Sequence, residues 1–183
     1  MEKEKFDWRE FVRFAAITLV IVIPVRILVA SPFVVSGSSM YPTFSNGNYL
    51  IIDKISYRLT EPKRDDVVVF RYPNDTTKFF IKRIIGLPFE TIDIKGSVVT
   101  ITSENKKEGF KLVEPYVKNT GNDNTHYELK ADEYFVMGDN RTASSDSRYW
   151  GAVSRKLLEG KAFLRLLPIS KIDIWPGYYE YKE

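Results

Sequence analysis

Hydrophobic and polar residues divide this chain into one long apolar run near the N-terminus and a remainder of short alternating segments. The run from Phe14 to Val35 is 22 residues long and carries one charge, Arg26. As a helix it would be about 33 Å long, close to the roughly 30 Å hydrocarbon thickness of a membrane. Pro24 falls late in the run, where a kink or the helix end is tolerated. The pattern therefore predicts one transmembrane helix over residues 14–35.

Three other interpretations of this run stay open. It could be a signal peptide cleaved after Leu28-Val29-Ala30, although Leu28 is a poor residue three positions before a cut and Arg26 interrupts the apolar region. It could be a buried helix of a soluble protein. It could lie flat on a membrane, but its apolar residues surround the helix and form no single stripe.

Charges beside the run predict its orientation. Four basic residues precede it: Lys3, Lys5, Arg9 and Arg13. After the run, no Lys or Arg occurs until Lys54. Because positive residues are retained on the cytoplasmic side of a membrane, we expect residues 1–13 in the cytoplasm and residues 36–183 outside it.

The pattern beyond the run predicts short strands. Six segments are rich in Val, Ile, Phe and Tyr: Tyr49–Asp53, Val67–Phe70, Phe79–Ile85, Thr91–Ile94, Val98–Ile101 and Tyr134–Met137. Turn residues separate them, as in Ser45–Asn48 and Tyr72–Asp75. Helical periodicity is weak except around Ser154–Glu159, and residues 102–132 are polar enough to leave the core. We therefore expect a mostly β domain with a mixed or barrel-like sheet.

Composition excludes several mechanisms. The net charge is only +3 and the basic residues form no clustered stripe, so we expect no nucleic-acid partner. Without Cys there can be no thiol nucleophile, disulfide or cysteine zinc site. The single histidine, His126, excludes zinc sites built from histidine pairs, and its polar surroundings indicate a solvated loop. A catalytic base would then be a lysine or a carboxylate.

Two stretches carry residues suited to nucleophilic catalysis. Ser39 lies in Ser36–Thr43, a small-residue turn directly after the apolar run that could expose a hydroxyl. Farther along, period-two alternation places Lys82 on the same face as Phe80 and Ile84. Burial on that face would disfavour the ammonium and lower the pKa of Lys82, so the neutral amine could accept a serine proton. A shift to a pKa of about 8 would cost roughly 3 kcal/mol, which the fold must supply.

A third stretch, Gly138–Gly151, follows the last expected strand. In it Asp146 and Arg148 could pair and fix a loop, and a serine could orient the lysine head. Taken singly, each stretch also fits an ordinary role: a Ser/Gly loop, a half-buried lysine whose head reaches water, or a polar surface turn.

Together and in this order, the stretches resemble type I signal peptidases of the bacterial single-anchor form. The matching segments are SGSSMYPT at 36–43, DVVVFRYP at 66–73, KRIIGLP at 82–88 and GDNRTASSDSRYWG at 138–151. The resemblance covers most of the chain between the apolar run and Gly151. It implies a largely β catalytic core with an inserted segment within roughly residues 89–133.

The resemblance also implies a role for each matching residue. Ser39 would be the nucleophile and Lys82 its general base, and Ser144 would hydrogen-bond to Lys82 and orient it. Asp146 and Arg148 would form a structural pair near the site. Five residues would line shallow pockets for small substrate side chains: Val35, Met40, Phe44, Phe80 and Ile81.

The activity implied is removal of N-terminal signal peptides from exported preproteins, with cleavage after a small −1 residue through an acyl-enzyme. No metal or cofactor is needed. The partners would be preproteins delivered by the export machinery and the lipid bilayer of the bacterial cytoplasmic membrane. Gly37 departs from members that carry a serine there to assist the oxyanion hole, which leaves the second donor of that hole open.

Two rival interpretations belong to other classes. A catalytically inactive, membrane-tethered peptide-binding protein could share the scaffold, although the intact Ser39, Lys82 and Ser144 argue against it. A self-cleaving Ser-Lys repressor shares the dyad logic, but it needs a DNA-binding module, for which residues 1–13 are too few. A carboxylate protease is weaker still, because no paired Asp motif is evident.

Overall fold

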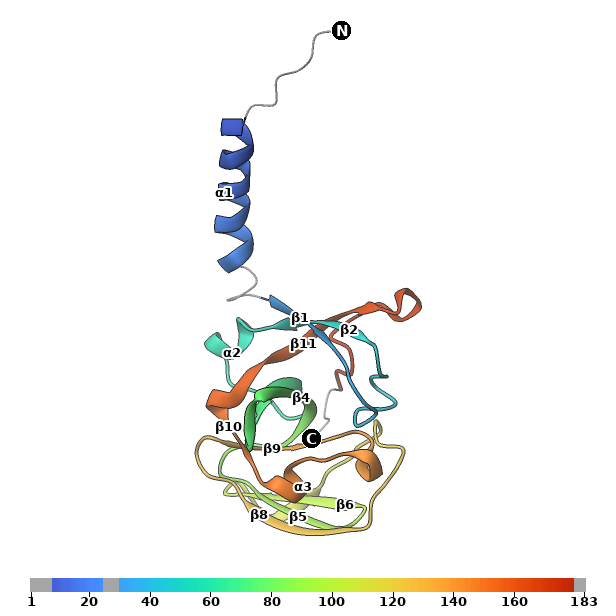
Figure 1. The fold of residues 1–183 in the computed structure, drawn as a ribbon. Helices are drawn as coiled ribbons and strands as arrows, with labels where there is room; N and C mark the ends of the chain where they lie inside the picture. Colours follow the sequence, from blue (N-terminus) through green and yellow to red (C-terminus); the bar gives the residue numbers. More distant parts are fainter. Residues whose placement is uncertain (1–7, 25–29, 180–183) are drawn as a thin grey trace.

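A computed structural model describes residues 8–24 and 30–179 of the chain. Helix α1 (Trp8–Pro24) extends away from a β domain that contains the rest of the described residues (Figure 1). Large apolar side chains are exposed around this helix: Trp8, Phe11, Val12, Phe14, Ile17, Leu19, Val20, Val22 and Ile23. In the described ranges, no helix combines the length and the apolar character that a membrane crossing requires.

The apolar run does not continue as a helix to Val35. Residues Ala30–Val34 form strand β1, which pairs antiparallel with β2 (Tyr49–Asp53). The expectation of a helix over residues 14–35 is therefore wrong at its C-terminal end. Pro32 gives the reason, because proline breaks a helix interior but is tolerated on the edge strand of a sheet, the position that β1 occupies.

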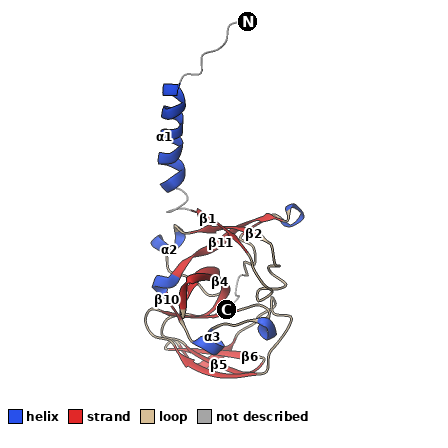
Figure 2. Ribbon diagram, in the orientation of Figure 1, coloured by secondary structure: helices blue, strands red, loops and turns tan. Residues whose placement is uncertain are grey.

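An eight-stranded sheet forms the centre of the β domain (Figure 2). Its strands follow the order β1-β2-β11-β3-β4-β9-β10, and β12 pairs with β11. The remaining members are β3 (Val67–Tyr72), β4 (Asp75–Gly86), β9 (Glu133–Met137), β10 (Val153–Ser154), β11 (Leu158–Leu167) and β12 (Asp173–Ile174). A mixed or barrel-like sheet was expected. The described strand pairs of this sheet are antiparallel, so the mixed alternative is wrong.

A second sheet of four strands, β7-β6-β5-β8, packs below the first (Figure 1). Its strands are β5 (Thr91–Gly96), β6 (Val98–Ser103), β7 (Lys106–Lys111) and β8 (Asp123–Glu128). All of them lie within residues 89–133, where the inserted segment was expected. Strand β8 was not predicted from the sequence, because it is polar and alternates between half-buried and exposed residues.

The six expected strands are confirmed as β2, β3, β4, β5, β6 and β9. One local expectation is wrong and another holds only in part. His126 is exposed but lies in β8, where its Nδ1 is 2.7 Å from Asp93 Oδ1, and so it is not a loop residue. The stretch Ser154–Glu159 contains a short 3-10 helix, η3 (Arg155–Leu157), between β10 and β11, so its helical pattern is confirmed for these three residues only. Tertiary pairing of β11 with β2 and β3 overrides its weak helical pattern.

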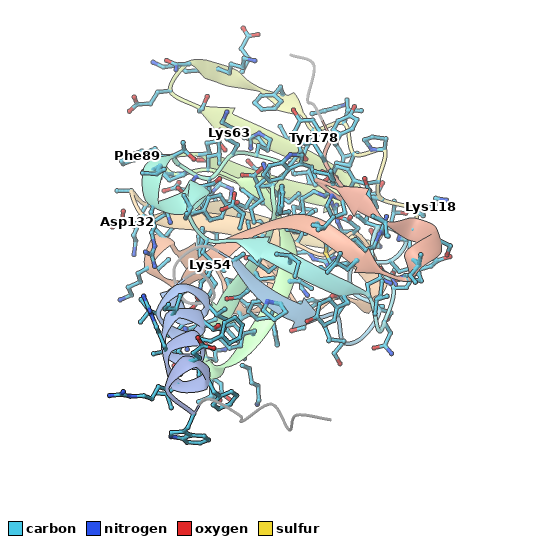
Figure 3. The ribbon with its side chains drawn as sticks, turned by 90° about the horizontal axis from the view of Figure 1, so that it is seen from above. Lys54, Lys63, Phe89, Lys118, Asp132 and Tyr178 are labelled. Carbon is cyan, nitrogen blue, oxygen red and sulfur yellow. The ribbon has the colours of Figure 1, made fainter. Side chains whose placement is uncertain are left out.

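The remaining helical elements are short and lie in the connections. They are α2 (Ser56–Leu59), η2 (Arg141–Ala143), α3 (Ser147–Trp150) and η4 (Ile169–Lys171). Basic side chains are spread over separate parts of the domain, as Lys54, Lys63 and Lys118 show in Figure 3.

Strand β3 is buried on both faces and separates two parts of the core. Val67 and Val69 pack in one cluster with Met40 and Phe44, which belong to the loop after β1. Val68 and Phe70 face a second cluster that contains Val136 of β9 and Leu158 of β11. Burial of each large apolar side chain stabilises the fold by roughly 1.5–3 kcal/mol. The loop that contains Ser39 is therefore fastened to the centre of the domain.

Candidate active site

Ser39 is held in the loop between β1 and β2 by contacts on both sides. Its carbonyl accepts a hydrogen bond from the Asn140 N–H (3.0 Å), and the Asn140 side-chain amide donates to the Ser38 carbonyl (3.1 Å). The next residue, Met40, is buried in the core. Gly37 has a φ of +91°, a conformation that favours glycine, so a serine at this position would be strained. The loop thus presents the Ser39 hydroxyl from a fixed backbone.

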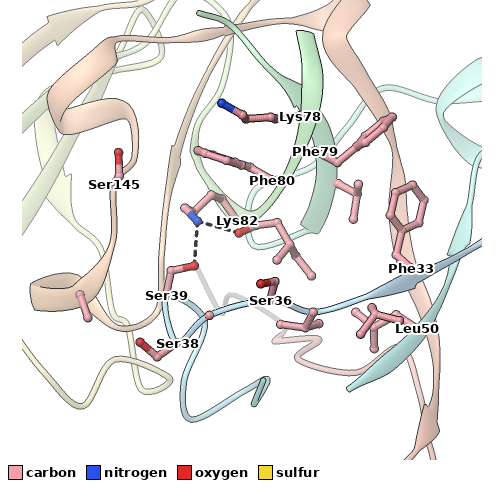
Figure 4. Close-up of a pocket in the computed structure, with 16 residues that line it drawn as sticks. Phe33, Ser36, Ser38, Ser39, Leu50, Lys78, Phe79, Phe80, Lys82 and Ser145 are labelled. Atoms are coloured by element: carbon pink, nitrogen blue, oxygen red, sulfur yellow. Dashed lines mark hydrogen bonds between the residues drawn. The ribbon is translucent and has the colours of Figure 1, made fainter. Parts of the chain in front are cut away.

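Lys82 lies opposite Ser39 on β4, and its side chain is buried, with 4% of the residue exposed. Its Nζ donates hydrogen bonds to Ser39 Oγ (2.8 Å) and to the Ile81 carbonyl (3.0 Å), as Figure 4 shows. Burial lowers the pKa of Lys82 to about 8, although the nearby carboxylates Asp146 and Asp139 oppose this shift. In about a tenth of the molecules the Lys82 amine is then neutral at pH 7, and in this form it can act as a base.

Arg83, the next residue of β4, points to the other face and pairs with Asp139. The Arg83 Nε lies 2.9 Å from Asp139 Oδ1 and Nη2 lies 2.7 Å from Oδ2, and neither side chain is exposed. This two-point geometry offsets much of the desolvation of two buried charges. The Thr43 hydroxyl also donates to Asp139 Oδ2. Asp139 therefore joins β4, the loop after β9 and the Ser39 loop.

Asp146 and Arg148 form the expected pair. The Arg148 Nε donates to Asp146 Oδ1 (2.7 Å) and Nη2 donates to Oδ2 (2.8 Å). Asp146 Oδ2 also accepts the Gly138 N–H (3.0 Å), while Arg148 Nη1 reaches Asp123 Oδ2 of β8 (2.6 Å). This pair fixes the turn that begins at Gly138 and ties it to the second sheet.

A cavity of about 630 Å³ opens beside Ser39 and Lys82. Its walls come from β1 and the following loop on one side and from β4 on the other. The lining is mainly apolar or small: Phe33, Val34, Val35, Ser36, Gly37, Ser38, Ser39, Leu50, Val69, Lys78, Phe79, Phe80, Ile81, Lys82, Ala143 and Ser145. An extended peptide could enter this cleft and bring a carbonyl to the serine. No group of three or more His, Asp or Glu side chains in the described ranges is suited to hold a metal ion.

Comparison with known proteins decides the family. Residues 8–167 match the family model described as signal peptidase, peptidase S26. The chain belongs to this peptidase family. It is 35% identical over 173 residues to "Probable signal peptidase I-2" of Synechocystis sp., with 91% of this chain and 77% of the relative covered.

Two further similarities fall in the same family. "Signal peptidase I V" of Bacillus subtilis is 33% identical over 159 residues, which cover 79% of this chain and 90% of the relative. The solved structure of a signal peptidase I from Enterococcus faecalis V583 matches with a TM-score of 0.45 and 30% identity, over 56% of this chain and 97% of that one. Membership of the signal peptidase family agrees with the mostly β fold and with a peptidase active site.

One expected contact of a signal peptidase site is absent. Ser144 is buried, but its Oγ has no hydrogen-bond partner among the described residues, whereas Lys82 Nζ donates to Ser39 and to the Ile81 carbonyl. The Ser144 side chain packs against Gly138 instead: a Cβ at Gly138 would come within 2.3 Å of Ser144 Oγ. The predicted hydrogen bond from Ser144 to Lys82 is therefore not formed.

The expected pocket residues divide into two groups. Val35, Phe80 and Ile81 line the cavity as expected. Met40 and Phe44 do not belong to its lining, and they are buried at 1% and 0% exposure in the core beneath it. The physical reason is that the chain turns between Ser39 and Phe44, so these two apolar side chains fasten the loop from below.

Several functional residues were not assigned a role from the sequence. Phe33 and Phe79, which both line the cavity, pack edge to face against each other, with ring centroids 5.3 Å apart. Phe33 was hidden inside the apolar run attributed to a helix. The pairing of Arg83 with Asp139 could have been predicted from the sequence. Arg83 is a charged residue inside an apolar strand, and such a residue needs a buried partner of opposite charge.

Proposed function

We propose that this chain is a membrane-bound serine endopeptidase that removes N-terminal signal peptides from exported preproteins. One observation carries the proposal: Lys82 Nζ lies 2.8 Å from Ser39 Oγ beside an apolar cleft. A lysine in this setting is available as a base near neutral pH, because burial lowers its pKa to about 8. Family membership provides the substrate class, since the relatives are named signal peptidase I.

The proposed reaction begins with neutral Lys82, which takes the proton of the Ser39 hydroxyl. The Ser39 oxygen attacks the carbonyl after the −1 residue, and backbone N–H groups, with that of Ser39 among them, stabilise the resulting oxyanion. The Lys82 ammonium then donates its proton to the leaving amine, which leaves an acyl-enzyme on Ser39. Lys82 next activates a water that hydrolyses the ester. The buried pairs Arg83–Asp139 and Arg148–Asp146 hold the two sides of the site during these steps.

Cleavage specificity follows from the cleft in this proposal. An extended substrate segment would lie between β1 and β4 and form backbone hydrogen bonds, while its side chains alternate between pockets. Val35, Phe80 and Ile81 provide apolar walls that leave room for small side chains at −1 and −3. A signal peptide that ends in Ala-x-Ala satisfies this requirement.

We further propose that the N-terminal apolar segment anchors the enzyme in the cytoplasmic membrane, with the catalytic domain on the extracytoplasmic side. Two features support this: apolar side chains are exposed all around α1, and basic residues, Arg9 and Arg13, stand near its N-terminus. The site then lies on the side of the membrane where a translocated precursor is still tethered by its signal peptide.

The function is tested with a purified precursor whose signal peptide ends in Ala-x-Ala. We expect the full chain in detergent to cut after the final Ala, and Ser39→Ala or Lys82→Met to lower kcat/KM by at least 10³-fold, since each removes one partner of the proton transfer. Ser38→Ala is the matched control, because this neighbouring serine lines the same cavity without contacting Lys82, and it should retain cleavage. Mass spectrometry of the products identifies the bond that is cut.

Cleavage that survives in Ser39→Ala would exclude Ser39 as the nucleophile. A folded wild-type protein that binds the precursor and leaves it intact would instead support the inactive peptide-binding protein.

A further inference from the structure

A second lysine occupies the same face of β4 as the proposed base. Lys78, Phe80 and Lys82 stand at alternate positions of this strand, so their side chains point to one side. All three line the cavity. Figure 4 shows Lys78 and Phe80 extending in the same direction from β4, while Phe79 points the other way.

The charges of the cleft are of one sign. Among its lining residues, Lys78 and Lys82 are the charged ones, and no carboxylate belongs to the lining. Lys82 is buried, whereas the side chain of Lys78 is 65% exposed at the mouth of the cleft. Lys78 therefore supplies an accessible positive charge to a binding surface made mainly of apolar and small side chains.

The contact that Lys78 makes within the protein is weak enough to be shared or replaced. Its Nζ lies 2.9 Å from Asp75 Oδ2 in the hairpin that begins β4, and both side chains are partly exposed. Water screens an ion pair that is this open to solvent, so the contact adds little to the stability of the fold. A carboxylate that is brought into the cleft by a bound peptide can therefore compete with Asp75 for the ammonium.

We propose that Lys78 is a specificity-determining residue that selects substrates with an Asp or Glu side chain three to five residues from the scissile bond. Lys78 and Lys82 are four residues apart on an extended strand, a separation of about 13 Å. A peptide strand lying along β4, with its scissile carbonyl at Ser39, has a residue about four positions away beside Lys78. Electrostatic complementarity of this kind selects among partners. The inference rests on the proposed peptidase function.

The test uses a series of peptides that differ from a reference only by Glu, Gln or Lys at one position, scanned from six residues before to five after the cut. For the full wild-type chain at low salt, we expect kcat/KM for Glu to exceed that for Gln by about 3–10-fold at one position, mainly through KM. The ratio should fall towards one at high salt, because salt screens exposed charges.

Variants of the two charged residues make the test specific. Lys78→Gln should bring the Glu-to-Gln ratio to about one, and Lys78→Glu should reverse the preference in favour of Lys. Asp75→Asn should enlarge the ratio, because it releases the ammonium from its partner. For each variant, kcat/KM for the Glu peptide is divided by kcat/KM for the Gln peptide. A change that affects both peptides equally therefore leaves this ratio unchanged. Lys95→Gln, an exposed lysine of the second sheet, is the matched control and should keep the wild-type ratio.

The outcomes separate the two proposals. If the wild-type chain does not cleave the Gln reference peptide, the peptidase proposal fails. If it cleaves that peptide but shows equal rates for Glu and Gln at every position, the role of Lys78 is refuted. A preference that persists in Lys78→Gln refutes that role as well, because another group must then recognise the carboxylate.

Discussion

The chemistry of the site depends on how single charges are arranged around Lys82. Two carboxylates, Asp139 and Asp146, lie close enough to raise its pKa, and alone they would favour the ammonium. Each of them is paired with an arginine, Arg83 or Arg148, in a two-point contact. Desolvation by burial outweighs the two carboxylates, so the pKa of Lys82 falls to about 8.

The pKa of Lys82 predicts a pH dependence of peptide cleavage. The neutral base becomes more abundant as pH rises through about 8, so kcat/KM should increase with pH and level off above that value. At pH 6, two units lower, it should be about a hundredfold below the plateau. The profile of kcat/KM between pH 5.5 and 9.5 with a peptide that lacks titratable side chains tests this expectation. A rate that is flat over this range, or that levels off only near the ordinary lysine pKa, would contradict it.

At the scale of elements, the connection between β7 and β8 packs behind β4, the strand that carries Lys82. The Tyr116 ring lies 3.8 Å from the Arg83 guanidinium carbon, and the Tyr116 hydroxyl donates to Asp65 Oδ1 (2.9 Å). Two residues earlier, Glu114 pairs with Arg141, whose Nε donates to the Gly138 carbonyl (3.1 Å). The inserted segment thus braces both β4 and the turn after β9.

This brace predicts a role for the Tyr116 ring. We expect Tyr116→Leu to lower the free energy of unfolding by about 1–3 kcal/mol, because it removes the aromatic face from a buried guanidinium. Movement of Arg83 should also lower kcat several-fold with little change in KM. Tyr116→Phe, which keeps the ring, should have a clearly smaller effect on both quantities. Urea unfolding measures the free energy of unfolding, and steady-state kinetics measures kcat and KM. Equal losses in Tyr116→Leu and Tyr116→Phe would assign the effect to the hydroxyl.

At the scale of the whole molecule, β1 connects the N-terminal segment to the catalytic cleft. This strand pairs along its length with β2, and its continuation carries Val35 and Ser39 into the site. Phe33 of the same strand packs against Phe79 of β4. The strand at the edge of the main sheet therefore also supplies Phe33 and Val34 to one wall of the cleft.

Two truncations distinguish this role of β1 from a passive linker. A chain that begins at Ala30 keeps the strand, and we expect it to remain folded and to cleave a short soluble peptide. A chain that begins at Ser36 loses the paired strand and Phe33, so its midpoint of urea unfolding should fall by an amount that corresponds to several kcal/mol. Equal midpoints for the two chains would show that β1 contributes nothing to the domain.

The N-terminal segment carries a separate prediction. A long flexible insertion between Pro24 and Ala30 leaves β1 intact, so cleavage of a soluble peptide should be unchanged. Processing of a precursor that is embedded in the same membrane should decrease, because the cleft is no longer held beside the bilayer. Unchanged processing in reconstituted vesicles would count against the tethering proposal.

The sequence alone determined the positions of most central strands and the residues of the candidate site. Short segments rich in Val, Ile, Phe and Tyr, separated by turn residues, predicted β2, β3, β4, β5, β6 and β9, because β-branched and aromatic side chains favour strands. The short motifs around Ser39, Lys82 and Asp146 also named the residues of the candidate site. The strands can be recognised from neighbouring residues, whereas the motifs are informative only together and in their order along the chain.

Tertiary structure decided what depends on partners far along the chain. Ser39 and Lys82 are separated by 43 positions and Arg83 and Asp139 by 56, and only the pairing of the strands brings them together. Residues 30–34 became a strand because Pro32 disfavours a helix and the edge of β2 was available for pairing, although the apolar run as a whole predicted a helix. For the same reason the fold, and not the local pattern, placed Met40 in the core and Lys78 at the mouth of the cleft. Local sequence specifies which faces are apolar, whereas long-range packing specifies what each face meets.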